Sequence, residues 1–286
     1  MNVAEIISKE LKKNSIKDIF MLTGYGAMYL NDAIEQSGIN FYAARNEAAA
    51  PMMAEAYAKS NNKIGAVCVT AGPGATNALP GLAEAYVDSA PIIILSGQVE
   101  NEYCADTYKK LNLRTLGTAE FSITRMLDKI TKYAVKIENP LNCLYLTQKA
   151  LYKAKSGRKG PVWIEIPLDI QSVEIKNPNK LKKFKIPKEK IKINKNNIKF
   201  IIDKLKTSKK PLFAIGNGLK QSNQLNIFKK ILSKTNIPFV TTRFANDLIP
   251  YSNTQNLGLC GIKGMPHSKK ITDDCDLIIA LGSRFS

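Results

Sequence analysis

The 286-residue chain has little that would mark a secreted or membrane-embedded protein. Its N-terminus, residues 1–5, has no basic start followed by an apolar core, which argues against a signal peptide. No run approaches the roughly 18 apolar residues that a membrane span needs. We therefore expect a cytoplasmic protein with no membrane partner.

Cysteine and histidine are too few and too scattered to suggest a disulfide framework or a zinc site. An odd set of five cysteines without a Cys-x-x-Cys pair argues for reduced thiols. The single histidine, His267, has no second metal ligand near it in the sequence, so we interpret it as a surface residue. The cysteines are Cys68, Cys104, Cys143, Cys260 and Cys275.

Arginine is absent from the most basic stretch of the chain, which runs from Lys176 to Lys234. Eighteen lysines there face only Glu189 and Asp203, a local net charge of +16 out of the chain's +18. Such a charge could attract nucleic acid or a membrane surface. The stretch has few aromatics and no binding motif, however. We interpret residues 173–195 as a solvated basic linker between domains, and we expect no nucleic-acid partner.

Short apolar runs alternate with helical patterns along the chain. Such runs are typical of parallel strands buried on both faces, and the alternation predicts an α/β fold with parallel sheets. Two domains follow, over 1–172 and 196–286. The expected strands lie at 19–22, 64–70, 92–95, 161–167, 212–215, 238–242 and 277–281, and the expected helices at 3–13, 28–36, 82–86, 144–155, 198–205 and 224–235.

The stretch from Arg45 to Gln98 combines a lone carboxylate with a glycine-rich turn. Glu47 stands at the start of an alanine-rich helical run, and the strand at 64–70 breaks into Gly-Pro-Gly at 72–74. In open α/β sheets, ligands bind at the carboxyl edge, where such turns expose backbone N–H groups. The alternative is a tight strand-to-helix turn without a ligand.

Several motifs in this stretch and beyond it resemble those of one enzyme family. They are Arg-Asn-Glu-Ala-Ala-Ala (45–50), Thr-Ala-Gly-Pro-Gly-Ala-Thr-Asn (70–77), Ser-Gly-Gln-Val (96–99), Gly-Pro-Val-Trp-Ile-Glu-Ile-Pro-Leu-Asp (160–169) and Leu-Ile-Ile-Ala-Leu-Gly-Ser-Arg (277–284). In this order they resemble the thiamine-diphosphate-dependent enzymes, and in particular the large subunit of acetolactate synthase.

The resemblance implies a fold, a cofactor and an activity. It implies a pyrimidine-binding domain over 1–172, followed by a partial Rossmann-like central domain. It implies decarboxylation of a 2-oxo acid such as pyruvate and carboligation, as in branched-chain amino acid biosynthesis. Glu47 matches the catalytic carboxylate that engages the cofactor's pyrimidine. The implied pocket residues are Gly24, Tyr25, Gly26, Thr70, Gly74, Asn77 and Gln98.

FAD is a second cofactor that the resemblance suggests. Arg158 matches an arginine that contacts FAD in the family. The glycine triplet Gly216, Asn217 and Gly218 matches a segment that lies against it. Arg158 could instead serve as a cation at the carboxyl end of a helix, where it would be favourable against the helix dipole.

The family's diphosphate and Mg²⁺ site has no counterpart in this sequence. That site requires a Gly-Asp-Gly segment, which the chain lacks, and Mg²⁺ requires oxygen ligands. We therefore expect the N-terminal half of a longer enzyme, either shortened or naturally split, that is inactive alone and takes Mg²⁺ through the missing domain. A homodimer or homotetramer is implied. The alternatives are a related enzyme acting on another 2-oxo acid or acyl-CoA, and a non-catalytic partner.

Overall fold

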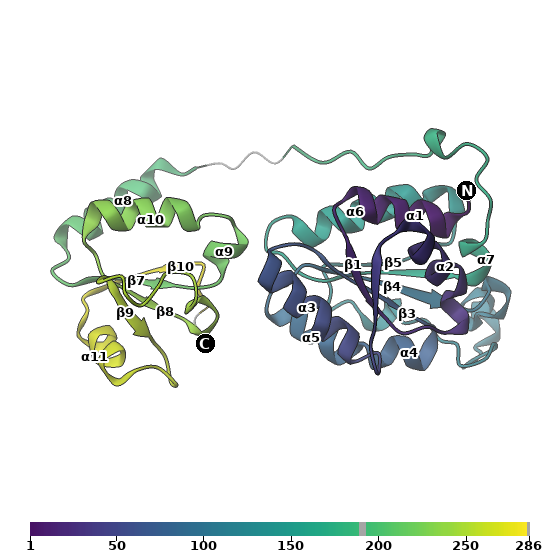
Figure 1. Cartoon of the computed structure of the whole chain (residues 1–286), viewed down its shortest axis with the longest axis horizontal. Coiled ribbons are helices and arrows are strands. Elements are labelled where there is room, and N and C mark those ends of the chain that lie inside the picture. Colours follow the sequence, from purple (N-terminus) through teal and green to yellow (C-terminus); the bar gives the residue numbers. More distant parts are fainter. Residues whose placement is uncertain (189–192, 285–286) are drawn as a thin grey trace. The chain divides into compact units, whose positions relative to one another are not determined.

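The structure is a computed structural model that describes residues 1–188 and 193–284. These residues divide into two compact units, Met1–Pro187 (unit 1) and Lys188–Ser286 (unit 2). Each unit holds a parallel sheet with helices packed on it (Figure 1). The predicted α/β fold with parallel sheets is therefore confirmed.

Unit 1 is built on a six-stranded parallel sheet with the strand order β2-β1-β3-β4-β6-β5. Strands β4 and β6, buried at the centre, are continuous apolar runs because helices cover both of their faces. The strands are β1 (Asp18–Met21), β2 (Asn40–Ala43), β3 (Gly65–Val69), β4 (Ile92–Gln98), β5 (Tyr133–Lys136) and β6 (Val162–Pro167).

Helices cover the two faces of this sheet in two separate hydrophobic clusters. One face carries α1 (Val3–Lys13), α2 (Met28–Ser37) and α6 (Cys143–Lys155). The other carries α3 (Ala49–Asn61) and α5 (Leu79–Val87), with the fully buried Trp163 of β6 beneath them. Two shorter helices stand at strand ends: α4 (Gly72–Asn77) and α7 (Leu168–Gln171).

Six short 3₁₀ turns complete the described part of unit 1. The long segment 99–123, between β4 and the turn η4, contains two of them. The turns are η1 (Tyr25–Ala27), η2 (Asn101–Tyr103), η3 (Ala105–Leu111), η4 (Thr124–Met126), η5 (Pro140–Asn142) and η6 (Pro178–Lys180).

The first half of the predicted linker, 173–195, packs on unit 1 through a few apolar side chains, while most of its other residues are exposed, as predicted. Ile175 and Leu181 are each less than a tenth exposed and belong to the core under α1 and α6. The ring of Phe184 lies edge-on against a tyrosine of α6, with ring centres 5.6 Å apart. Apolar residues spaced among the lysines explain this packing. Residues 189–192 lie outside the described residues.

Unit 2 holds a four-stranded parallel sheet with the order β10-β7-β8-β9. Its core is a stack of edge-on rings from Phe213, Phe228 and Phe239. The strands are β7 (Pro211–Ile215), β8 (Phe239–Thr241), β9 (Asn256–Leu259) and β10 (Leu277–Leu281); the helices are α8 (Lys195–Thr207), α9 (Gly218–Gln221), α10 (Leu225–Thr235) and α11 (Pro266–Asp274), with the turn η7 (Arg243–Ala245).

No helix within 1–188 or 193–284 combines the length and the apolar character needed to cross a membrane. His267, the only histidine, is exposed on α11, and its Nε2 lies 3.4 Å from the hydroxyl of Tyr251.

Candidate functional site

Six of the residues proposed from the sequence meet at the carboxyl ends of β1 and β3. A methyl group added at Gly24 would lie 2.6 Å from Cβ of Thr70. One added at Gly74 would lie 2.6 Å from Cγ2 of Thr70 and 3.1 Å from Oε1 of Glu47. These distances leave no room for a side chain at either glycine. We call Gly24, Gly26, Glu47, Thr70, Gly74 and Asn77 the carboxylate cluster.

Of the two carboxylate oxygens of Glu47, one accepts a hydrogen bond and the other accepts none from the described residues. Its Oε2 accepts a 2.8 Å hydrogen bond from Nδ2 of Asn77. No group in the described part of the chain donates to Oε1. The residue is half-buried in the turn two residues before α3, whereas the sequence suggested the helix itself. The carboxylate is thus oriented by Asn77 and still able to hold a proton at Oε1.

Residues 72–77, expected as a turn, form the helix α4. Pro73 stands in its first turn, where the fixed φ of proline favours helix initiation. Gly72 has φ of +54°, and an added Cβ would lie 1.6 Å from the carbonyl oxygen of Ala119, so only glycine fits there. Because Gly74 and Asn77 are three residues apart on α4, both face Glu47.

The peptide of Gly26 is held from both sides. Its N–H donates to Oγ1 of Thr70 at 3.2 Å, and its carbonyl accepts from Nε2 of Gln171 at 2.7 Å. Gln171, fully buried, also donates to the carbonyl of Ile166 and accepts from the N–H of Leu30. Sequence reasoning missed Gln171. Its only signal was a glutamine just after an apolar strand.

Tyr25 and Gln98, also proposed as pocket residues, make their hydrogen bonds outside the cluster. Tyr25 is exposed and donates its hydroxyl to Oε1 of Glu100 at 2.9 Å, and this hydrogen bond raises the pKa of Tyr25. Gln98 is buried, and its amide donates to Oε1 of Glu165 and to the carbonyl of Phe121. Gln98 therefore connects strands β4 and β6 to segment 99–123.

The carboxylate cluster fits the pyrimidine end of thiamine diphosphate but not the metal end. A carboxylate with one unpartnered oxygen is the kind of group that an aminopyrimidine ring nitrogen pairs with. In residues 1–188 and 193–284, no three histidine, cysteine, aspartate or glutamate side chains gather closely enough to hold a metal ion. A site for Mg²⁺ and diphosphate does not fit the described residues, and we derive no step through it.

The glycines proposed to bind FAD do not offer unpaired backbone N–H groups to a ligand. The N–H groups of Gly216 and Gly218 donate to the carbonyls of Leu281 and Gly282, at 2.9 and 3.0 Å. Asn217 is half-buried between them. Arg158 belongs to unit 1, before β6, where its Nε donates to the hydroxyl of Ser89 at 2.7 Å. Since these backbone donors are already used, we derive no step through FAD.

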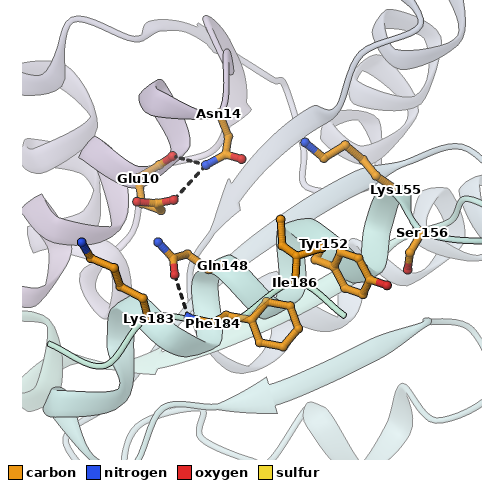
Figure 2. Close-up of a pocket in the computed structure, with 9 residues that line it drawn as sticks. All are labelled: Glu10, Asn14, Gln148, Tyr152, Lys155, Ser156, Lys183, Phe184 and Ile186. Carbon is orange, nitrogen blue, oxygen red and sulfur yellow. Dashed lines mark hydrogen bonds between the residues drawn. The ribbon is translucent and has the colours of Figure 1, made fainter. Parts of the chain in front are cut away.

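A cavity of about 400 Å³ lies elsewhere on unit 1, between α1, α6 and the returning segment 183–186 (Figure 2). Its buried polar groups are paired with each other: Asn14 donates to Glu10, and the N–H of Phe184 donates to Gln148. The cavity borders the carboxyl ends of α1 and α6, hence the amino ends of the strands that follow them. It is not part of the carboxylate cluster.

Comparison with known proteins places both units in one family. Residues 1–118 match the thiamine pyrophosphate enzyme N-terminal TPP binding domain, and residues 198–286 match the central domain of the same enzymes. The acetolactate synthase large subunits of Lactococcus lactis and Haemophilus influenzae are 33% and 30% identical to the chain over 285 and 287 residues. A probable acetolactate synthase large subunit of Methanocaldococcus jannaschii is 30% identical over 295 residues.

These matches cover 99 to 100% of this chain but 48% of each relative. The chain therefore spans about half the length of the relatives it matches.

Proposed function

Because the chain belongs to the thiamine pyrophosphate enzymes, with their N-terminal and central domains, we propose that it forms the pyrimidine-binding half of an acetolactate synthase-like active site. The observation that carries the proposal is Glu47, held by Asn77 at the carboxyl edge of the sheet. The names of the relatives support a 2-oxo acid such as pyruvate as the substrate.

The chemistry is divided between the cofactor and the chain. Thiamine diphosphate, when bound, supplies the electron sink that lets a 2-oxo acid lose carbon dioxide. Glu47 holds a proton at Oε1 for exchange with the pyrimidine, and Asn77 keeps its carboxylate in position through Oε2. Gly74 keeps the space beside Glu47 clear, since a side chain there would strike the carboxylate.

Three further features belong to this proposal. We propose that Mg²⁺ and the diphosphate are held by residues outside this chain, because the described residues offer no cluster of ligands. We propose a homodimer as the smallest active unit, with a second subunit facing the carboxylate cluster. The alternatives are a related enzyme acting on another 2-oxo acid or acyl-CoA, and a non-catalytic partner of a split enzyme.

Replacing Glu47 by glutamine tests the proposal. The substitution is made in the full-length natural protein that contains these 286 residues. The amide keeps the size of the side chain but cannot take up and share a proton. We expect turnover of pyruvate to fall by about 10²- to 10⁴-fold, with cofactor binding largely kept. The measurement is NMR of proton–deuterium exchange at C2 of bound thiamine diphosphate, alongside pyruvate consumption.

Glu84→Gln is the control, because Glu84 is exposed on α5 and lies outside the carboxylate cluster. Glu84→Gln should leave both the C2 exchange rate and the rate of pyruvate consumption unchanged. The 286-residue chain alone should bind the cofactor weakly and show no pyruvate turnover. Equal exchange rates in Glu47→Gln and the parent would remove Glu47 from the chemistry and favour the non-catalytic alternative.

A further inference from the structure

Segment 99–123, which follows the carboxyl end of β4, is held to the sheet of unit 1 through two buried side chains, Gln98 and Glu165. Nε2 of Gln98 donates to the carbonyl of Phe121 at 2.9 Å and to Oε1 of Glu165 at 2.8 Å. The other end of the same amide, Oε1, accepts from the N–H of Val99 at 2.9 Å. Gln98 thus joins both ends of the segment to β4, and its remaining partner is the carboxyl group of Glu165.

Glu165 is a buried acid with an unsatisfied oxygen. It lies on β6, between β4 and β5, and is 1% exposed. Trp163, two residues before Glu165 on β6, faces the same side of the sheet and is fully buried. No group in the described parts of the chain forms a hydrogen bond with its Oε2. A charged oxygen without a partner in such a place is unfavourable, so burial favours the protonated carboxyl.

The charged and titratable groups around Glu165 only partly offset this burial. Lys136 lies beside it in register on β5 and favours its ionised form, but no ion pair joins the two in the described residues. Asp106, from η3, opposes ionisation and is itself paired with Arg125 at 2.9 Å. Cys104 is an uncharged neighbour, since burial raises its pKa to about 11.

Burial is the largest influence on Glu165 and raises its pKa to about 7, against the attraction of Lys136, the hydrogen bond from Gln98 and the backbone N–H of Ile123. When the segment lifts, water reaches the carboxyl group, and its pKa returns toward the ordinary 4.5. The closed segment therefore binds a proton that the open one releases.

We propose that Glu165 is a positioning residue whose protonated form fastens segment 99–123 to the sheet and whose ionisation loosens it. The proposal does not depend on the reaction that the protein catalyses.

The direction follows from linkage between protonation and closure. Because the closed state has the raised pKa, the stabilisation of closure is fully present below pH 4.5 and is lost as pH rises through about 7. From pH 5.5, inside this window, to pH 8.5, above it, the open fraction of the segment rises by about 30-fold.

Amide hydrogen exchange of the full chain, followed by mass spectrometry at both pH values and corrected for intrinsic exchange rates, measures this opening. In the parent, peptides covering 99–123 should lose about 30-fold in protection at the higher pH. In Glu165→Gln, the neutral amide still accepts from Gln98, so protection should be high and independent of pH.

Glu55→Gln is the matched control, since Glu55 is equally buried but sits on α3 and pairs with Lys59. It should keep the pH dependence of 99–123. The proposal fails if the parent shows equal protection of this segment at the two pH values, a result that needs no variant to fold. It also fails if Glu165→Gln retains the pH dependence.

Discussion

At the scale of residues, two buried side-chain amides position the backbone near the site. Gln171 holds the peptide of Gly26 and the strand end at Ile166, and Gln98 holds segment 99–123. Each amide has a donor end and an acceptor end, so one side chain can satisfy several buried backbone groups at once. Both lie where strands end and regular backbone pairing stops.

Gln171→Leu should lower the free energy of unfolding by about 2 to 4 kcal/mol. Leucine has a similar size, but the carbonyls of Gly26 and Ile166 lose a donor in a buried place, and an unmet buried group costs about 1 to 3 kcal/mol. Urea denaturation followed by circular dichroism measures the change. Gln36→Leu, on the exposed face of α2, should change it by less than about 0.5 kcal/mol. Equal losses of unfolding free energy in the two variants would show that the hydrogen bonds of Gln171 do not stabilise the fold.

At the scale of elements, the sheet edges and the short helices were the hardest to predict. The strands expected at 64–70, 92–95 and 161–167 are confirmed, because strands buried on both faces need unbroken apolar runs. Strand β2 was missed because it is the outermost strand and all four of its residues are exposed. Strand β5, at the opposite edge, is only half-buried and was missed for the same reason.

Helix α3 packs on β3 so closely that Gly65 should not tolerate a side chain. A methyl group there would lie 2.1 Å from the carbonyl oxygen of Ala54. We expect Gly65→Ala to lower the free energy of unfolding by about 3 kcal/mol, the upper range for overpacked cores, because helix and strand must separate. Thermal or urea unfolding provides the measurement.

Gly157→Ala is the comparison for this substitution. Gly157 has φ of +55° and no atom within 4 Å of an added Cβ, so alanine should cost only about 1 kcal/mol, the penalty of the left-handed conformation. Similar losses for both variants would mean that α3 moves away from β3 without difficulty.

At the scale of the whole molecule, positive charge is concentrated in the middle of the chain. Lysines supply nearly all of it, and part of the segment that carries them packs on unit 1 through Ile175 and Leu181. Packing thus explains the apolar residues of this segment. The lysines between them remain available for non-specific attraction of anions.

Affinity for duplex DNA should therefore stay in the non-specific range, with a dissociation constant of about 10⁻⁴ to 10⁻⁶ M at physiological salt. It should weaken steeply as salt rises, because only phosphate charges are being neutralised. Fluorescence anisotropy with two unrelated duplexes gives both readings. A nanomolar complex with one sequence and not the other would overturn the expectation of no nucleic-acid partner.

The sequence alone determined the α/β class, the buried strands and the candidacy of Glu47, Gly74 and Asn77. Those features are local: apolar runs, glycine turns and short motifs are written in neighbouring residues. Tertiary structure alone decided that Asn77 donates to Glu47, 30 residues away. It also decided that Gln98 turns to Glu165 across 67 residues and that Gln171 reaches Gly26 across 145. Polar contacts between distant residues leave no periodic pattern, because they depend on strand order and on which face each side chain occupies.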